Sequence, residues 1–127
     1  MDDSRVTLVV PARPTFARSV RMMAANLAVL CSMSVEDVED ARMAAEEAFV
    51  YACATGPNEC GISFDISDAQ LSMTFGLGEG AGEEDPALAE HIGLAKVLLM
   101  AVSDECDIDR EGRTLRVTKR VGGFHAV

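Results

Sequence analysis

The sequence predicts an α+β fold in which helices cover one face of a single sheet. Three observations lead to this prediction. The first is the order of periodic segments, strand–helix–helix–strand–strand–helix–strand–strand, with no repeat and no linker between them. The second is the length of 127 residues, which suits one domain spanning residues 1–127. The third is the apolar content of 49%, which is enough to fill one core.

The first half of the chain predicts one strand and two helices. Arg5–Ala12 is rich in β-branched residues and closes on a proline, which is typical of a strand. Thr15–Cys31 is rich in helix formers behind a threonine that can cap it. Ser34 can cap a second helix, which ends before Gly56-Pro57-Asn58. Apolar residues recur every three or four positions, so each helix should bury one face. The stripes are Phe16, Val20, Met23, Leu27 and Leu30 in the first helix, and Val35, Val38, Ala41, Ala45, Ala48, Phe49 and Ala52 in the second.

The second half predicts two hairpins separated by a helix. Gly61–Ser67 and Gln70–Leu77 are typical of two strands joined by a tight turn. An acidic, glycine-rich loop follows at Gly78–Pro86, and Ala87–Glu105 has the composition of a third helix. The last two strands flank a turn at Glu111-Gly112.

Charge is distributed unevenly along the chain. The formal net charge is −10, but Val35–Asp109 holds eighteen acidic residues against two basic ones, and the flanking segments are basic. An acidic middle disfavours nucleic acid as a partner, because binding a phosphate backbone relies on Lys and Arg. It favours either a basic protein partner or an acidic surface that only aids solubility.

The cysteines and the apolar runs favour a cytoplasmic protein. Cys31, Cys53, Cys60 and Cys106 lie in or beside apolar runs without C-x-x-C or metal-ligand spacing, so we expect reduced thiols and no metal site. The acidic N-terminus lacks the apolar stretch of a signal peptide. No run approaches the ~20 apolar residues that span a bilayer. We therefore expect no membrane partner.

Familiar catalytic patterns are not completed. The glycines at 76–82 match neither G-x-x-x-x-G-K-[ST] nor G-x-G-x-x-G, and the acidic residues around them would repel a phosphate. No nucleophilic triad is suggested, because His91 and His125 each stand alone in the sequence.

Several longer segments resemble those of one known family. "SVEDVED" followed by "RMAAEEAFVYACATG" is similar to the second helix of the anti-sigma-factor serine kinases. "IGLAKVLLMAVSDECDI" is similar to their glycine-box helix, and "TLRVTKRV" resembles their last strand. The likeness runs from "LVVPA" to Val121. It implies the Bergerat ATP-binding fold of the GHKL ATPase superfamily, a two-layer sandwich with helices on one face of a mixed or antiparallel sheet.

The resemblance implies a catalytic pair on the second helix. In that family, a Glu of this helix is the general base toward a serine hydroxyl, and an Asn one turn later holds the magnesium that bridges the ATP phosphates. Glu47 stands in the Glu place and Tyr51 in the Asn place. Their spacing of four puts both on one helix face. A phenol is a bulky and poor ligand for Mg²⁺, which takes compact oxygen donors in octahedral geometry.

The nucleotide-binding glycines implied by the resemblance are incomplete. The family's D-x-G-x-G motif falls on "FGLGEG", where Gly76 and Gly78 remain but no Asp is present to select adenine. Its glycine box falls on His91–Ala95, where Gly93 alone remains, so Cβ atoms would intrude on the phosphates. The intervening lid is short and has no basic residue for a γ-phosphate. These changes together argue against ATP and magnesium as cofactors.

The sequence thus predicts a degenerate, kinase-like regulator of transcription that acts by binding. The resemblance implies a sigma factor or an anti-sigma antagonist as the partner, and a homodimer, because members of the family dimerise. It also implies that Arg18 and Arg21 of the first helix contact the partner. The alternative is that both arginines are solvated, or pair with Glu residues of the second helix.

Two further functions stay open at the level of the sequence. One is an active ATP-dependent protein serine kinase, which would keep Glu47 as its base and require ATP and Mg²⁺. The other is a small-molecule sensor that uses the altered pocket, lined by Tyr51, Phe75 and Leu77. A ligand that co-purifies with the protein would favour the sensor.

Overall fold

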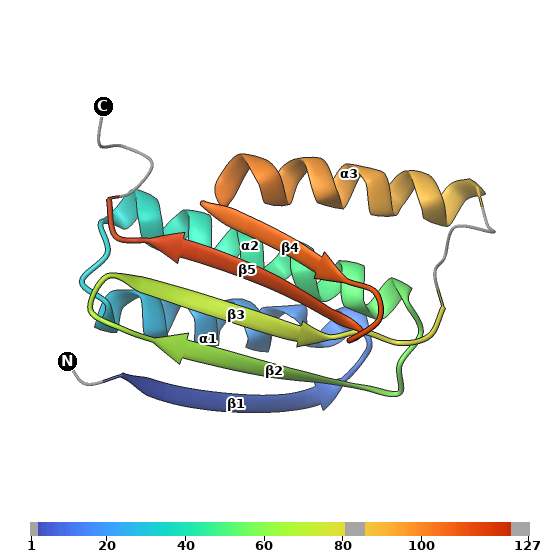
Figure 1. The fold of residues 1–127 in the computed structure, drawn as a ribbon, viewed down its shortest axis with the longest axis horizontal. Helices are drawn as coiled ribbons and strands as arrows, with labels where there is room; N and C mark the ends of the chain where they lie inside the picture. The colour runs from blue at the N-terminus through green and yellow to red at the C-terminus, as the bar shows by residue number, and fades with distance from the viewer. Residues whose placement is uncertain (1–2, 81–85, 123–127) are drawn as a thin grey trace.

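The computed structural model describes residues 3–80 and 86–122, with the backbone alone for residues 86–89 and 91. Its elements follow the predicted order (Figure 1). They are β1 (Ser4–Pro11), a 3₁₀ turn η1 (Pro14–Phe16), α1 (Ala17–Leu30), α2 (Val35–Ala54), β2 (Glu59–Ile66), β3 (Gln70–Gly76), α3 (Pro86–Val102), β4 (Glu105–Asp109) and β5 (Thr114–Arg120).

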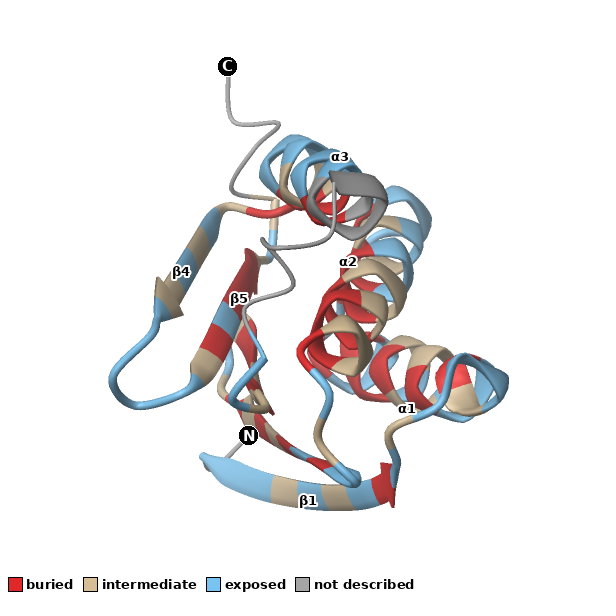
Figure 2. Cartoon of the chain, turned by 90° about the vertical axis from the view of Figure 1, so that its right-hand side faces the viewer, coloured by how far each residue is buried: buried red, intermediate tan, exposed pale blue. Residues whose placement is uncertain are grey.

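The five strands form one antiparallel sheet in the order β1-β2-β3-β5-β4. All three α-helices lie on the same face of it, α1 toward β1 and α3 toward β4 (Figure 2). The predicted α+β class, with helices on one sheet face, is therefore confirmed. Strand side chains alternate between the two faces. In β2, for example, Cys60, Ile62, Phe64 and Ile66 are buried while the residues between them are not.

The core lies between the sheet and the helices. Its largest fully buried side chains include Phe49 of α2, Phe64 of β2 and Phe75 of β3. The buried positions of α1 and α2 are mainly small: Ala17, Ala24, Ala28, Ala41, Ala44, Ala45, Ala48 and Ala52. Small side chains at a contact let two helices approach closely, which fits the extensive packing of α1 against α2 (Figure 2).

Only one of the two predicted helix caps is confirmed. The Ser34 hydroxyl accepts a hydrogen bond from the backbone N–H of Asp37 at 3.1 Å, so α2 begins as expected. The prediction for Thr15 is wrong, because Thr15 lies within η1 and no side chain caps α1. Pro14 explains the difference. A proline with its fixed φ suits the start of a helical turn, and here it begins a 3₁₀ turn ahead of α1.

The apolar stripes of α1 and α2 are correct in the middle and wrong where the two helices join. Val20, Leu27, Ala41 and Ala48 are buried as predicted. Leu30 is 51% exposed and Val35 is 81% exposed, on either side of the short connection. Periodicity extends a stripe to the end of a helix, but burial stops where no neighbouring element covers it.

The predicted third helix is too long at its C-terminus. α3 ends at Val102, and Glu105 already belongs to β4. The backbone N–H of Asp104 donates to Thr118 O at 2.9 Å, and the Asp104 carboxylate accepts from the N–H of Arg120 at 2.7 Å. Pairing with β5 thus overrides the helical propensity of this segment.

A buried ion cluster joins the start of α2 to the end of β5. Lys119 is 1% exposed, and its ammonium group lies 3.2 Å from an Asp40 carboxylate oxygen and 3.6 Å from an oxygen of Asp37. Asp37 is also buried, and its other oxygen accepts from the N–H of Gly122 at 3.0 Å. Buried charges persist in folded proteins when they are paired in this way.

Candidate functional site

The last turns of α2 carry the two residues that the resemblance singles out. Tyr51 is buried and Glu47 is half-buried, one turn apart on the same helix. Both residues take part in interactions within the protein. The resemblance would require a compact magnesium ligand at the position of Tyr51, and here a buried phenol stands there.

The glycine-rich loop after β3 is bound to the end of α2 through Thr55. The backbone N–H of Gly78 donates to the Thr55 hydroxyl at 2.8 Å, and that of Gly80 donates to the Thr55 carbonyl at 2.9 Å. The hydroxyl itself donates to Ala52 O at 2.6 Å. These N–H groups are thereby used inside the protein, whereas in a phosphate-binding loop they would face the ligand.

Gly78 allows this close approach because it lacks a Cβ atom. A Cβ atom at this position would lie 2.5 Å from Thr55 O and 2.6 Å from Pro57 N, both backbone atoms. Gly80 is similarly close, with a Cβ position 2.8 Å from Thr55 O. Gly78, one of the glycines predicted as a degenerate nucleotide motif, thus has a packing role that the sequence alone did not reveal.

The turn between β4 and β5 completes the site. Gly112 N–H donates to the Asp109 carboxylate at 3.0 Å, and Arg113 adopts a left-handed φ of 52°. The Arg113 carbonyl accepts from Leu77 N–H at 2.8 Å, and its guanidinium lies 3.1 Å from the Glu79 carboxylate. The turn and the glycine-rich loop are therefore tied together at the backbone and at the surface.

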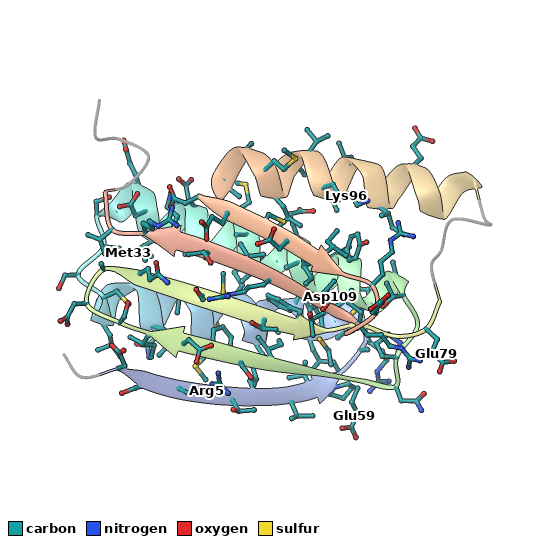
Figure 3. All side chains as sticks on the ribbon, in the orientation of Figure 1. Arg5, Met33, Glu59, Glu79, Lys96 and Asp109 are labelled. Carbon is teal, nitrogen blue, oxygen red and sulfur yellow. The ribbon has the colours of Figure 1, made fainter. Side chains whose placement is uncertain are left out.

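These three segments enclose a cavity of about 150 Å³. It lies at the end of the molecule where Figure 3 labels Glu79 and Asp109, opposite the end where Met33 is labelled. Its lining consists of Tyr51, Thr55, Leu77, Gly78, Glu79, Gly80, Ile108, Arg110 and Arg113. Pockets for drug-sized ligands and cofactors usually measure roughly 300–1,000 Å³. The space between the described residues is therefore smaller than is usual for a cofactor pocket.

The other predicted glycines lie outside this lining. Gly76 ends β3 opposite Thr114 of β5. Gly93 is exposed on α3, and a Cβ atom there would meet nothing within 4 Å. Phe75, expected in the sensor pocket, is fully buried in the core. The structure brings Tyr51, Leu77 and Gly78 together at one cavity, but not Gly76, Gly93 or Phe75.

The site contains residues that the sequence reasoning missed, among them Thr55, Arg110 and Arg113. Thr55 directly precedes Gly56-Pro57, so it could have been recognised as the hydroxyl-bearing residue that follows α2. Arg110 and Arg113 bracket the predicted Glu111-Gly112 turn. Their place at the cavity follows only from the pairing of β5 with β3, which the sequence does not specify.

The two arginines predicted to contact a partner differ in the structure. Arg21 forms an ion pair with Glu46 of α2 at 2.6 Å, which confirms the alternative interpretation for this residue. Arg18 is exposed, one turn before Met22, whose side chain is also exposed. Among the described residues, none forms a hydrogen bond or an ion pair with the side chain of Arg18.

Neither a metal-binding cluster nor a membrane-spanning helix is found in the described part of the chain. It contains no cluster of three or more His, Cys, Asp or Glu side chains arranged to hold a metal ion. Within residues 3–80 and 86–122, no helix combines the length and the apolar character needed to cross a membrane.

Comparison with known protein families and with curated proteins gives no match.

Proposed function

We propose that this chain is a non-catalytic, Bergerat-type relative of the anti-sigma serine kinases and acts in transcription control by binding a sigma factor or an anti-sigma antagonist. The observation that supports the loss of catalysis most directly is the set of hydrogen bonds that Thr55 accepts from the glycine-rich loop. Thr55 accepts hydrogen bonds from the N–H groups of Gly78 and Gly80. Both glycines belong to the loop that the resemblance assigns to nucleotide binding. The element order and the antiparallel sheet are compatible with this relationship.

The cavity size gives independent support. At about 150 Å³ it is well below the volume of usual cofactor pockets. Tyr51, which stands where the resemblance implies a magnesium ligand, is buried. Opening the site for ATP would require breaking the Thr55 contacts and moving Tyr51, without gaining a metal ligand in return.

The binding surface we propose is the exposed face of α1. α1 contains Arg18 and Arg21 but no acidic residue. Arg18 and Met22 are one turn apart and both exposed, so they form a basic and apolar strip at helical spacing. Arginine and methionine are both enriched at protein interfaces. Such a strip suits an acidic, amphipathic segment of a partner protein.

Calorimetric titration tests the loss of the nucleotide site. ATP and ADP are titrated into the purified protein with and without Mg²⁺, and we expect no heat of binding. Radiolabelled ATP with a panel of anti-sigma antagonists should give no phosphoserine. Magnesium-dependent ATP binding, together with phosphate transfer that the Glu47→Gln variant abolishes, would instead establish the kinase.

Binding assays test the role of α1. A panel of purified sigma factors and anti-sigma antagonists is screened for binding to the wild-type chain. We expect Arg18→Glu to weaken the complex at least about tenfold, since charge reversal at an interface costs on the order of 1.4 kcal/mol or more. Arg42→Glu is the matched control, because Arg42 is an exposed arginine of α2, paired only with Glu39 of its own helix. Equal effects of the two variants would exclude α1 as the specific surface.

The cavity supports a second candidate function, the binding of a small anion. Arg110 and Arg113 both line it, and a negative ligand could replace Glu79 beside Arg113. Native mass spectrometry of the purified protein would detect a retained ligand, and titration with inorganic phosphate and small dicarboxylates would test binding directly. We expect Arg113→Gln to abolish any such binding while Arg116→Gln, on the outer sheet face, leaves it intact. Wild-type protein that binds none of these anions would remove this candidate.

A further inference from the structure

The face of the sheet that points away from the helices is covered by no helix or strand of the described residues (Figures 1 and 2). The strand register places one row of side chains across this face. The row runs through all five strands and consists of Arg5, Asp65, Ser72, Thr118 and Glu105. Arg5 pairs with Asp65 at 2.7 Å, and Glu105 pairs with Arg120 at 2.7 Å. The charges at both ends of the row are therefore balanced, while its middle carries two hydroxyl groups.

The middle of this row is recessed. Ser72 is 1% exposed and Thr118 is 2% exposed, although no helix covers them, and their hydroxyl oxygens lie 3.0 Å apart. Short side chains are buried on an uncovered face only where longer neighbours stand around them. Ser72 lies in the lining of an open pocket of about 500 Å³, a volume within the usual range for small-molecule sites. The charged and amide side chains of this lining are those of Asp3, Arg5, Asp65, Gln70 and Arg116.

Two hydrogen-bond donors converge on Ser72. The Arg116 guanidinium and the Gln70 amide each donate to Ser72 Oγ at 3.5 Å. Hydrogen bonds from N–H donors usually measure about 2.7–3.2 Å, so both contacts are long and weak. Asp107 lies opposite Arg116 in the register, yet among the described residues no carboxylate forms an ion pair with Arg116. An exposed guanidinium is thus available to an anionic group in the pocket.

Carboxylates lie on the other side of Ser72. Asp65 stands directly opposite Ser72 in the pairing of β2 with β3, which sets their Cβ atoms about 4.5–5.5 Å apart. The Asp65 carboxylate accepts from Arg5 at 2.7 and 3.4 Å, and its side chain remains 38% exposed. A carboxylate can accept about four hydrogen bonds, so Asp65 can also accept from a cation in the pocket. Asp3 adds a second carboxylate to the lining.

We propose that this pocket binds a free α-amino acid. The carboxylate of the ligand accepts hydrogen bonds from Arg116 and Gln70, in place of their long contacts to Ser72. The ammonium group of the ligand donates to the carboxylates of Asp65 and Asp3. An α-amino acid carries both charges on one carbon atom. This short separation matches a pocket in which a cationic and an anionic side chain lie on either side of a single serine.

Ligands with one kind of charge fit this pocket less well. A simple anion such as phosphate would pair with Arg116 but lie beside the carboxylates of Asp65 and Asp3, and like charges in contact oppose binding. A simple amine would leave Arg116 unpaired. All lining residues except Ile66 are polar or charged, so an amino acid with a polar side chain such as glutamine suits the remaining volume. The site is independent of the function proposed above, because it uses neither α1 nor the smaller cavity.

Calorimetric titration with matched ligands tests the pocket. L-glutamine is titrated into the purified chain and compared with glutaramate, which lacks the α-ammonium group, and with 4-aminobutanamide, which lacks the α-carboxylate. We expect L-glutamine to bind. Each truncated ligand should bind at least about tenfold more weakly, because it loses one set of charge-assisted hydrogen bonds. A chain that binds none of the proteinogenic amino acids, or that binds either truncated ligand as tightly as L-glutamine, would overturn the proposal.

Two arginine variants locate the bound amino acid. Arg116→Gln removes the charged partner of the ligand carboxylate and should weaken L-glutamine binding at least about tenfold. Arg113→Gln, at the smaller cavity, is the matched control and should leave the affinity unchanged. Both arginines are exposed, and circular dichroism establishes that each variant keeps the fold. In NMR spectra of wild type, L-glutamine should shift the amide signals of Gln70 and Ser72 but not that of Gly78. Equal affinity of Arg116→Gln and wild type, or loss of binding in Arg113→Gln alone, would contradict this site.

Discussion

At the scale of single residues, Thr55 organises the candidate site. Its hydroxyl accepts from Gly78 and donates to Ala52, and its carbonyl accepts from Gly80. One residue thus ends α2 and fixes a loop that lies 23 positions further along the chain. The sequence pointed to Tyr51 and the glycines, because the resemblance gave them roles. It could not point to Thr55, whose contacts are long-range in sequence.

Gly78 and Gly93 provide a matched test of the packing role that we assign to the glycine-rich loop. Gly78→Ala should lower the free energy of unfolding by about 1–3 kcal/mol, since the new methyl group would overlap backbone atoms of Thr55 and Pro57. Gly93→Ala should instead raise it by up to about 1 kcal/mol, because Gly93 is an exposed helix residue with open space around it. Urea unfolding measures both. Equal changes would show that Gly78 is not needed for close packing.

At the scale of elements, local signals predicted the strands and the α2 cap, while contacts between elements decided the rest. Ser34 was recognisable because its partner Asp37 is three positions away. The end of α3 was misplaced because Asp104 and Glu105 are held by β5. The cavity also depends on contacts between elements. The β4–β5 turn lies near the end of α2 only because the strand order places β5 beside β3. Neither periodicity nor composition specifies that order.

The cluster around Lys119 predicts a strong coupling between α2 and β5. Lys119→Met should lower the free energy of unfolding by about 3–5 kcal/mol, because it leaves the buried Asp37 carboxylate without its cation. Asp40→Asn should lower the free energy of unfolding by less, because the side chain at position 40 is 33% exposed and water can solvate the new amide group. Urea unfolding of the two variants gives the comparison.

A double-mutant cycle separates the ion pair from simple packing. Lys119→Met combined with Asp37→Asn removes both charges, so its cost should be smaller than the sum of the two single costs. Additive costs would mean that Lys119 and Asp37 stabilise the junction independently. In that case the cluster would not act as a unit between α2 and β5.

At the scale of the whole molecule, the fold lays the basic flanks of the sequence against its acidic middle. Ion pairs of this kind join Arg5 to Asp65, Arg21 to Glu46, Arg113 to Glu79, Lys119 to Asp37 and Asp40, and Arg120 to Glu105. The acidic segment is thus partly neutralised within the chain. This partial neutralisation weakens the case for a basic partner that is steered by the acidic middle. It favours α1 as the binding surface, because Arg18 stays exposed there.

The buried thiol of Cys60 predicts how the stability of the whole molecule depends on alkaline pH. Burial, and to a smaller extent the nearby Cys53, raises the pKa of Cys60 from 9.0 to about 12. The folded state therefore keeps this thiol protonated at a pH where the unfolded chain releases the proton. Ionisation thus favours unfolding, and the contribution of Cys60 is complete below about pH 9 and is lost as the pH rises toward about 12.

Comparison with Cys60→Ala isolates this contribution. Between pH 9 and 11, wild type should lose up to about 1.4 kcal/mol per pH unit more than the variant, the value for one proton. Urea unfolding at several pH values measures the difference, and the variant's own lower stability cancels because only slopes are compared. Cys106→Ala is the control, since Cys106 is only half-buried and should change the slope less. Parallel curves for wild type and Cys60→Ala would show that folding does not raise the pKa of Cys60.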